Sequence, residues 1–195
     1  VAVLSREKFL TLENSKDVLG YTTKFREDPI YLDPRHKDLG ARLITNLEKL
    51  HLSLKLLELK SSNLDEYYSV SNKLGIPQIN TDKLQNNLFG IECNLNELNG
   101  IDFKKGCYVG QENTARIKLK DKLSKRLFPV EVIEGDLSKD NIIHHENTEL
   151  GKVLINNKFP FAIVKFKDKN FKFEKIFKCG SASVKIKKPY WFKFD

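Results

Sequence analysis

The stretch that decides the fold of the second half of the chain is RLFPVEVIEG, residues 126–135. Apolar and polar side chains alternate along much of it, and successive side chains of a strand point to opposite faces. Four further short runs follow, each bounded by Gly, Asn, Asp or Pro: ELGKVLIN (149–156), FPFAIVKF (159–166), FKFEKIFKCG (171–180) and ASVKIKKP (182–189). This spacing predicts an antiparallel sheet or a small barrel.

Lysine and phenylalanine are interleaved over residues 159–177, which lie in the more basic part of the chain. Residues 1–119 carry 17 Lys and Arg against 16 Asp and Glu, a net charge of +1, and residues 120–195 carry 17 against 10, a net charge of +7. Aromatic side chains in a positive groove can stack on single-stranded nucleic acid, so a basic RNA-binding module is one hypothesis. Strand alternation favours core packing, with phenylalanines facing inward and lysines facing water, which makes nucleic acid a less favoured partner.

The first half mixes strands and helices. The segment IYLDPRHKDLGARLIT, residues 30–45, predicts strand, turn and strand, with the corner at Asp33-Pro34-Arg35. Ser62 and Asp65 have capping-box-like spacing, and apolar residues at helical intervals predict a helix from about Leu64 to Leu74. Residues 81–102 predict a short helix followed by a loop.

Composition limits the function classes. The chain has 195 residues, 40% of them apolar and 31% charged, as in a soluble globular protein with one core or two small ones. No run approaches the roughly 18–20 apolar residues that cross a bilayer, which excludes a membrane-spanning segment. The opening residues, VAVLSREKFL, do not resemble a signal peptide and predict a strand instead.

The three cysteines, Cys93, Cys107 and Cys179, are an odd number and lie far apart, without CxxC pairing or nearby histidines. This pattern favours a reducing compartment and argues against a self-contained zinc site. Cys93 and Cys179 fit the usual role of an unpaired cysteine, a small buried apolar residue.

Cys107 lies in a different setting, within DFKKGCYVGQENTAR, residues 102–116. Gly106 and Gly110 bracket Cys107-Tyr108-Val109, and glycines permit positive φ or close approach to the backbone. A helix is predicted to begin near Gln111, and a helix N-terminus with two preceding lysines favours the thiolate over the thiol. A thiolate can attack electrophiles or ligate iron, although a buried structural cysteine remains the alternative.

The motif KGCYVGQE, with the following TAR, closely resembles the signature of the YgfZ-like family of iron–sulfur cluster assembly factors. Other segments follow in family order along essentially the whole chain: DPR…LGARLI, GIP, ECNL…NGIDF, KRLFPV, LGKV and PYWF. The family is similar in fold to the aminomethyltransferase of the glycine cleavage system. Its known members are longer at the N-terminus, so we expect this chain to begin partway through their first domain.

The resemblance implies an α+β fold: part of an aminomethyltransferase-like, folate-binding α/β domain at residues 1–122, then a small antiparallel β-barrel at residues 123–195. It implies a mitochondrial matrix protein that helps to build [4Fe-4S] clusters for recipient enzymes together with an A-type scaffold protein. Cys107 matches the motif cysteine, the expected ligand of an iron–sulfur cluster shared with that partner. We therefore expect an assembly factor rather than an enzyme.

The other motif residues are assigned to shaping the loop and its charge, with ordinary loop and helix packing as the alternative: Lys105, Gly106, Tyr108, Gly110, Gln111, Glu112 and Arg116. Glu92, in GIECNL, matches a folate-contacting acid of the transferase, although a loop glutamate is more often simply solvated. The alternative function is accordingly a tetrahydrofolate-dependent aminomethyl or one-carbon transferase, with tetrahydrofolate as cofactor.

Overall fold

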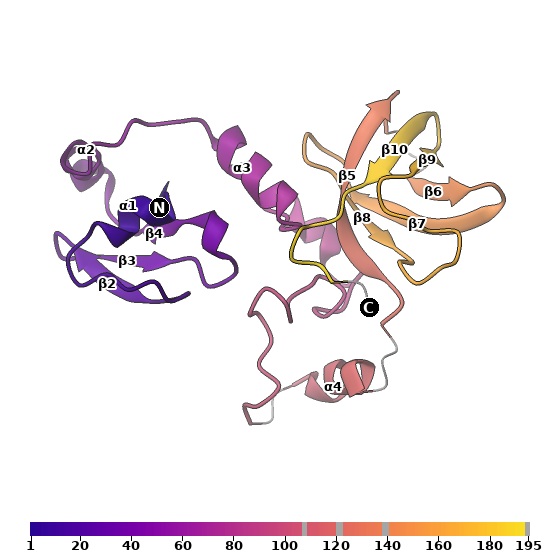
Figure 1. Ribbon diagram of the computed structural model, residues 1–195, viewed down its shortest axis with the longest axis horizontal. Helices are drawn as coiled ribbons and strands as arrows, with labels where there is room; N and C mark the ends of the chain where they lie inside the picture. Colours follow the sequence, from indigo (N-terminus) through magenta and orange to yellow (C-terminus); the bar gives the residue numbers. More distant parts are fainter. Residues whose placement is uncertain (107–108, 120–122, 138–140, 194–195) are drawn as a thin grey trace. The chain divides into compact units, whose positions relative to one another are not determined.

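The computed structural model describes residues 1–106, 109–119, 123–137 and 141–193. Contacts along the chain divide it into two compact units, one of Val1–Val70 with Leu98–Gly100 and one of Ser71–Glu97 with Ile101–Asp195. One unit holds a four-stranded sheet and the other a closed six-stranded barrel, which confirms the predicted α+β fold (Figure 1). The domain boundary predicted after residue 122 stays a prediction.

The first unit is built on an antiparallel sheet with the strand order β1-β4-β3-β2. The strands are β1 (Ala2–Leu4), β2 (Thr22–Phe25), β3 (Asp28–Leu32) and β4 (Ala41–Leu43). Helix α1 (Arg6–Leu10) adds the fully buried Phe9 to the core that these strands form. The predicted strand, turn and strand are therefore confirmed, and the 3-10 helix η1 (Lys37–Leu39) occupies part of the turn.

The corner between β3 and β4 is held by a buried carboxylate. Asp33, with a side chain only 1% exposed, accepts hydrogen bonds from Arg35 Nε at 3.0 Å and Arg42 Nε at 2.8 Å. Arg42 also donates to the Tyr67 hydroxyl at 2.6 Å. Gly40 follows the 3-10 turn with φ +70, and a Cβ there would overlap the Leu4 carbonyl oxygen. The residues of the DPR and LGARLI motifs thus form one polar network and one close backbone contact.

Two helices follow the sheet in sequence. Helix α3 (Leu64–Lys73) confirms the predicted helix, but its first turn is capped by Asn63, whose Oδ1 accepts from Glu66 N at 3.1 Å, rather than by Ser62. Helix α2 (Leu47–Leu56) was not predicted. Asn46 caps it by accepting from Lys49 N at 2.8 Å, and leucines recur along it at helical intervals.

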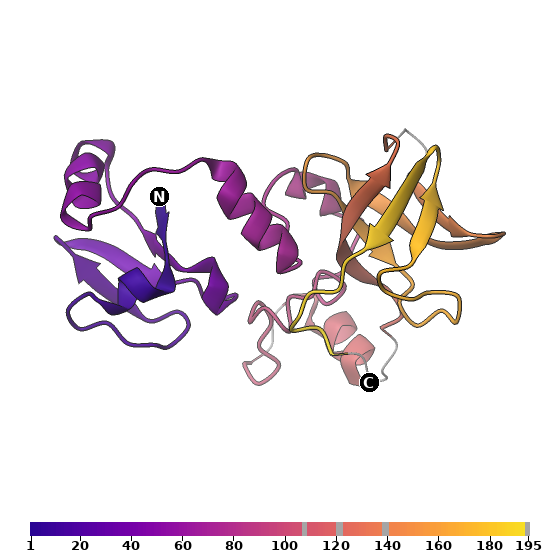
Figure 2. The ribbon, with the colours of Figure 1, turned by 45° about the horizontal axis from the view of Figure 1, so that its top comes forward.

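The second unit contains the barrel, with the strand order β10-β5-β8-β7-β6-β9, and every pair is antiparallel. Figure 2 shows β9 and β10 side by side, as their pairing requires. The strands are β5 (Arg126–Glu134), β6 (Ile142–His145), β7 (Thr148–Ile155), β8 (Phe161–Val164), β9 (Ile176–Cys179) and β10 (Ala182–Ile186). The all-β prediction for the part of the chain after Lys125 is confirmed in the residues that the structure describes.

Phenylalanines fill much of this core. Phe128 contacts Phe173 and Phe192 edge to face, with ring centroids 5.1 and 5.0 Å apart. Phe161 and Phe177 are buried, whereas the lysines at positions 167, 169, 172, 175 and 178 are exposed. The prediction that the interleaved phenylalanines serve core packing is therefore confirmed. The same unit contains the 3-10 helix η2 (Thr81–Leu84) and helix α4 (Gln111–Leu119).

Candidate functional site

The segment that carries the motif cysteine, residues 104–110, is here called the signature loop. Cys107 and Tyr108 lie outside the described residues, so their placement stays a prediction. The structure does describe the two ends of the loop, the helix that follows it and the segment that precedes it. These neighbouring elements show which residues hold the two ends of the loop.

The two glycines of the signature loop differ. Gly110 has φ +85, a conformation that glycine adopts without a steric penalty, and the Thr114 hydroxyl donates to its carbonyl oxygen at 3.4 Å. A Cβ placed on Gly106 would meet nothing within 4 Å, and Gly106 is not among the glycines with positive φ. Backbone conformation therefore accounts for Gly110, while local space does not require glycine at position 106.

Helix α4 begins at Gln111, as predicted, four positions after Cys107 in the sequence. None of its residues is buried, and Val109 just before it is fully exposed. Arg116 forms an ion pair with Glu112 one turn earlier, and with side chains 57% and 82% exposed this pair adds little stability. Glu112 and Arg116 thus interact with each other, and their role in shaping the loop and its charge stays a prediction.

The two ends of the signature loop are tied together at its base. Phe103 precedes the loop and Ile117 lies in α4, and both pack against the core of the barrel. Lys118 Nζ lies 3.7 Å from the centre of the Phe103 ring and 3.4 Å from Asn96 Oδ1. Asp102 Oδ1 accepts from Lys104 N at 2.8 Å, which turns the chain at the start of the loop. We call these contacts the base of the signature loop.

The segment before this base is fixed to the first strand of the barrel. Asn94 is fully buried, and its amide donates to the Leu127 carbonyl oxygen at 2.8 Å while its Oδ1 accepts from Arg126 Nη1 at 2.9 Å. Arg126 also pairs with Glu97 at 2.6 Å. Sequence reasoning missed the roles of Asn94 and Arg126. Both lie in motifs that carried the family resemblance, ECNL and KRLFPV, which was the available signal.

Glu92 was predicted as a weak candidate for contact with folate. Its Oε2 accepts from Phe89 N at 2.9 Å, so the carboxylate is hydrogen bonded within its own turn. That contact explains an acidic residue here without a ligand, and the folate role of Glu92 stays a prediction.

The two described cysteines differ from an exposed, activated thiol. Burial raises the pKa of Cys93 to about 11, and the neighbouring Glu92 charge acts in the same direction. Cys179 ends β9 and has no exposed surface. The prediction of a small buried residue is confirmed for Cys179, whereas Cys93 is only partly buried.

Two further properties concern ligands and membranes. Across residues 1–106, 109–119, 123–137 and 141–193, no group of three or more His, Cys, Asp or Glu residues is arranged to hold a metal ion. The described helices also include none with the length and apolar character needed to span a bilayer.

Curated proteins similar to this chain match about half of it. A protein of Dictyostelium discoideum named iron-sulfur cluster assembly factor IBA57 homolog, mitochondrial, is 34% identical over 115 residues, which are 58% of this chain and 28% of that protein. The Mus musculus protein named iron-sulfur cluster assembly factor IBA57, mitochondrial, is 36% identical over 110 residues, 56% of this chain and 30% of its own length. The Homo sapiens protein of the same name is 35% identical over 102 residues, 52% of this chain and 28% of its own length.

The matched region therefore spans less than a third of the length of each of these relatives. No family model matches the chain. These relatives are named iron–sulfur cluster assembly factors, like the family whose signature is similar to KGCYVGQE of this chain. The mixed α and β fold with a barrel agrees with that resemblance. Over about half of its length, the chain is thus similar to IBA57 (YgfZ-like) iron–sulfur cluster assembly factors.

Proposed function

We propose that this protein acts in the mitochondrial matrix as an assembly factor for [4Fe-4S] proteins, and that Cys107 supplies one ligand to the transferred cluster. The observation that carries the proposal is the KGCYVGQE motif in a chain whose relatives are named mitochondrial iron–sulfur cluster assembly factors. The cluster is cargo in this scheme, bound for a time and then passed on to a recipient enzyme.

Local chemistry supports Cys107 over the other two cysteines. The N-terminus of α4 begins four positions after Cys107, and Lys104 and Lys105 precede it, so positive charge is concentrated in this part of the sequence. Positive charge lowers the pKa of a thiol, and the thiolate is the form that binds iron. Cys93, with its pKa raised to about 11, and the fully buried Cys179 lack these advantages.

Ligand number supports the need for a partner. An iron–sulfur cluster is commonly held by four cysteine thiolates, and Cys107 can supply only one of them. The remaining ligands would come from an A-type scaffold protein, which would share the cluster across the interface. On ligation the Cys107 thiol loses its proton to solvent, and the sulfur forms the bond to iron.

The residues around Cys107 would present the thiolate and not react themselves. Gly110, with its positive φ, permits the turn into α4, and the base of the signature loop holds both of its ends on the barrel core. Gln111, Glu112 and Arg116 form the first turns of α4. With Lys105 they would set the charge that a partner meets at the loop.

The proposal is tested by cluster transfer under anaerobic conditions. The protein is mixed with a cluster-loaded A-type scaffold protein and an apo [4Fe-4S] enzyme, and recovery of enzyme activity is followed. We expect wild type to speed this recovery relative to the scaffold protein alone. Cys107→Ala should abolish the acceleration, because no thiolate remains to share the cluster, and Cys93→Ala should retain it. Equal acceleration by wild type and Cys107→Ala would refute the role of Cys107.

The alternative, a tetrahydrofolate-dependent one-carbon transferase, stays a prediction. The Glu92 carboxylate accepts a hydrogen bond from Phe89 N, so no described contact of Glu92 favours this alternative over the first proposal. Titration with tetrahydrofolate, combined with a turnover assay, separates the two functions, because only the transferase requires folate binding and turnover.

A further inference from the structure

The barrel carries a groove that the proposed function does not use. It has a volume of about 660 Å³, within the range of roughly 300–1,000 Å³ that is typical of small-molecule sites. Its lining comes from β5, from the loop after β5, from the β7–β8 turn, from the residues after β10 and from the end of α3. All of these residues belong to the second unit, and none lies in the signature loop.

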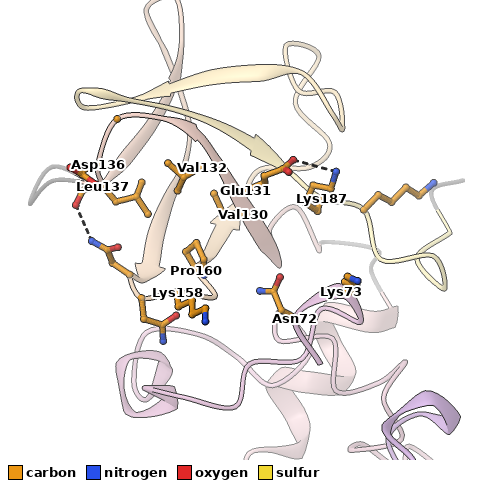
Figure 3. A pocket seen from close by; sticks show the side chains of 14 residues that line it. Asn72, Lys73, Val130, Glu131, Val132, Asp136, Leu137, Lys158, Pro160 and Lys187 are labelled. Carbon is orange, nitrogen blue, oxygen red and sulfur yellow. Dashed lines mark hydrogen bonds and ion pairs between the residues drawn. The ribbon is translucent and has the colours of Figure 1, made fainter. Parts of the chain in front are cut away.

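The floor of the groove is apolar. Figure 3 shows Val130, Val132, Leu137 and Pro160 around the hollow, with Asn72 and Lys73 of α3 below them. Val130 and Pro160 are buried, whereas Val132 remains 38% exposed to solvent. A ligand with an apolar body would remove this surface from water, which favours binding.

Two amide groups in the wall have hydrogen-bond donors without acceptors. Among the described residues, the Nδ2 atoms of Asn72 and Asn157 are buried and have no hydrogen-bond partner. The orientation of the Asn157 amide is fixed, because its Oδ1 accepts from Phe159 N at 2.7 Å. A buried donor without an acceptor is unfavourable, and an occupant of the groove that carries acceptor oxygens would reduce this cost.

The charged residues around the groove also favour an occupant with acceptor oxygens. Its lining includes four lysines, Lys73, Lys158, Lys187 and Lys188, and only two acids, Glu131 and Asp136. Glu131 is already paired with Lys187, with the two charged atoms 3.4 Å apart (Figure 3). The exposed Lys73 and Lys188 therefore leave the groove with excess positive charge beside an apolar floor.

We propose that this groove is a binding site for a small organic anion that has an apolar body and at least one acidic group. The apolar floor would contact the body, and Lys73 and Lys188 would neutralise the acidic group. The unpartnered amides of Asn72 and Asn157 would donate to its oxygens. This combination of apolar contact and donors selects against neutral aromatic compounds and against inorganic anions, each of which satisfies only one half of the site.

The proposal is tested by nuclear magnetic resonance with four probes: phenyl phosphate, phthalate, inorganic phosphate and benzamide. We expect the two aromatic anions to shift the backbone amide signals of Gly135 and Asn157 in a saturable way. Benzamide should bind at least about tenfold more weakly because it is uncharged and offers no charge-assisted hydrogen bond. Inorganic phosphate should bind at least about tenfold more weakly because it has no apolar body to cover the floor of the groove. A preference for phenyl phosphate or for phthalate identifies the acidic group as phosphate or carboxylate, and either result supports the site.

Matched variants complete the test. Lys73→Gln combined with Lys188→Gln should raise the Kd of the better aromatic anion about tenfold or more. Lys169→Gln combined with Lys172→Gln removes the same charge from two exposed positions outside the groove lining and should leave the Kd within about twofold. The proposal fails if neither aromatic anion shifts the two groove signals, or if the two double variants weaken binding equally.

Discussion

The carboxylate of Asp33 offers the sharpest test of how the first unit is held together. Its Oδ1 accepts from the backbone N and Nε of Arg35, both at 3.0 Å, and its Oδ2 accepts from Arg35 Nη2 and Arg42 Nε, both at 2.8 Å. In Asp33→Asn one oxygen remains and the other acceptor becomes an NH₂ group. That group would face two donors, so two charge-assisted hydrogen bonds are lost in a site that is 1% exposed.

At roughly 1.5–3 kcal/mol for each charge-assisted bond, and with two arginines left partly buried without their counter-ion, we expect a loss of about 3–5 kcal/mol. Hydrogen exchange of the β3 and β4 amides should then become about 10²–10⁴-fold faster at neutral pH. Asp17→Asn is the matched control. It makes the same chemical change in an ion pair with Arg6 whose side chains are 30% and 52% exposed, and it should speed exchange by about fivefold or less.

The same residue predicts a pH dependence. Burial acts to raise the pKa of Asp33, but the hydrogen bonds and charges of Arg35 and Arg42 outweigh it and hold the pKa below its ordinary value. A carboxyl group of this kind stabilises the fold above its unfolded pKa of about 3.9 and loses that contribution as the pH falls through its folded pKa. The difference between wild type and Asp33→Asn should therefore shrink below about pH 4. Equal exchange rates for Asp33→Asn and Asp17→Asn at neutral pH would refute this reasoning.

Three further predictions concern the sheet, the thiols and the base of the signature loop. Gly40→Ala should lower the free energy of unfolding by about 2–4 kcal/mol, because Gly40 has φ +70 and a Cβ would overlap a carbonyl of β1. In the control Gly106→Ala, a Cβ meets nothing within 4 Å, so the free energy of unfolding should change by about 0.5 kcal/mol or less. Equal losses for the two variants in urea titrations would contradict this. Iodoacetamide should label Cys93 slowly at pH 8 and faster as the pH rises toward its pKa of about 11; rapid labelling at pH 7, measured by peptide mass, would be inconsistent with its burial. Phe103→Leu should speed tryptic cleavage in the signature loop about fivefold. It removes the ring that lies 3.7 Å from Lys118 Nζ, and with it about 1 kcal/mol of cation–π stabilisation. Unchanged cleavage would show that this contact does not restrain the loop.

Much of the fold could be predicted because its signals are local. Alternating residues predicted the barrel strands, and Gly75 with Pro77 marked the end of the helix that the structure places at Leu64–Lys73. Helix α2 was missed although Asn46 caps it. Leucines fall on opposite sides of this helix, and those at positions 47, 52 and 56 are exposed. The segment therefore lacks a continuous polar face opposite an apolar one, which is the usual mark of an amphipathic helix.

The polar contacts that anchor the candidate site could not be predicted, because they join residues far apart in sequence. Asn94 and Arg126 are 32 positions apart, and nothing in either segment alone indicates that the amide and the guanidinium meet. Lys118 and Phe103 likewise lie on opposite sides of the signature loop. The resemblance identified the motifs that contain Asn94, Arg126, Asp33 and Gly40. The structure adds the contacts that explain why these residue types occur at those positions.

The most direct test of the central proposal is the absorption spectrum of the cluster shared by this protein and an A-type scaffold protein, reconstituted without oxygen. Thiolate-to-iron charge-transfer bands depend on the ligands, so replacing sulfur by oxygen in Cys107→Ser should shift or abolish them. The control variants Cys93→Ser and Cys179→Ala should leave the spectrum of the shared cluster unchanged. An identical spectrum and identical complex formation for wild type and Cys107→Ser would contradict the assignment of Cys107 as a cluster ligand.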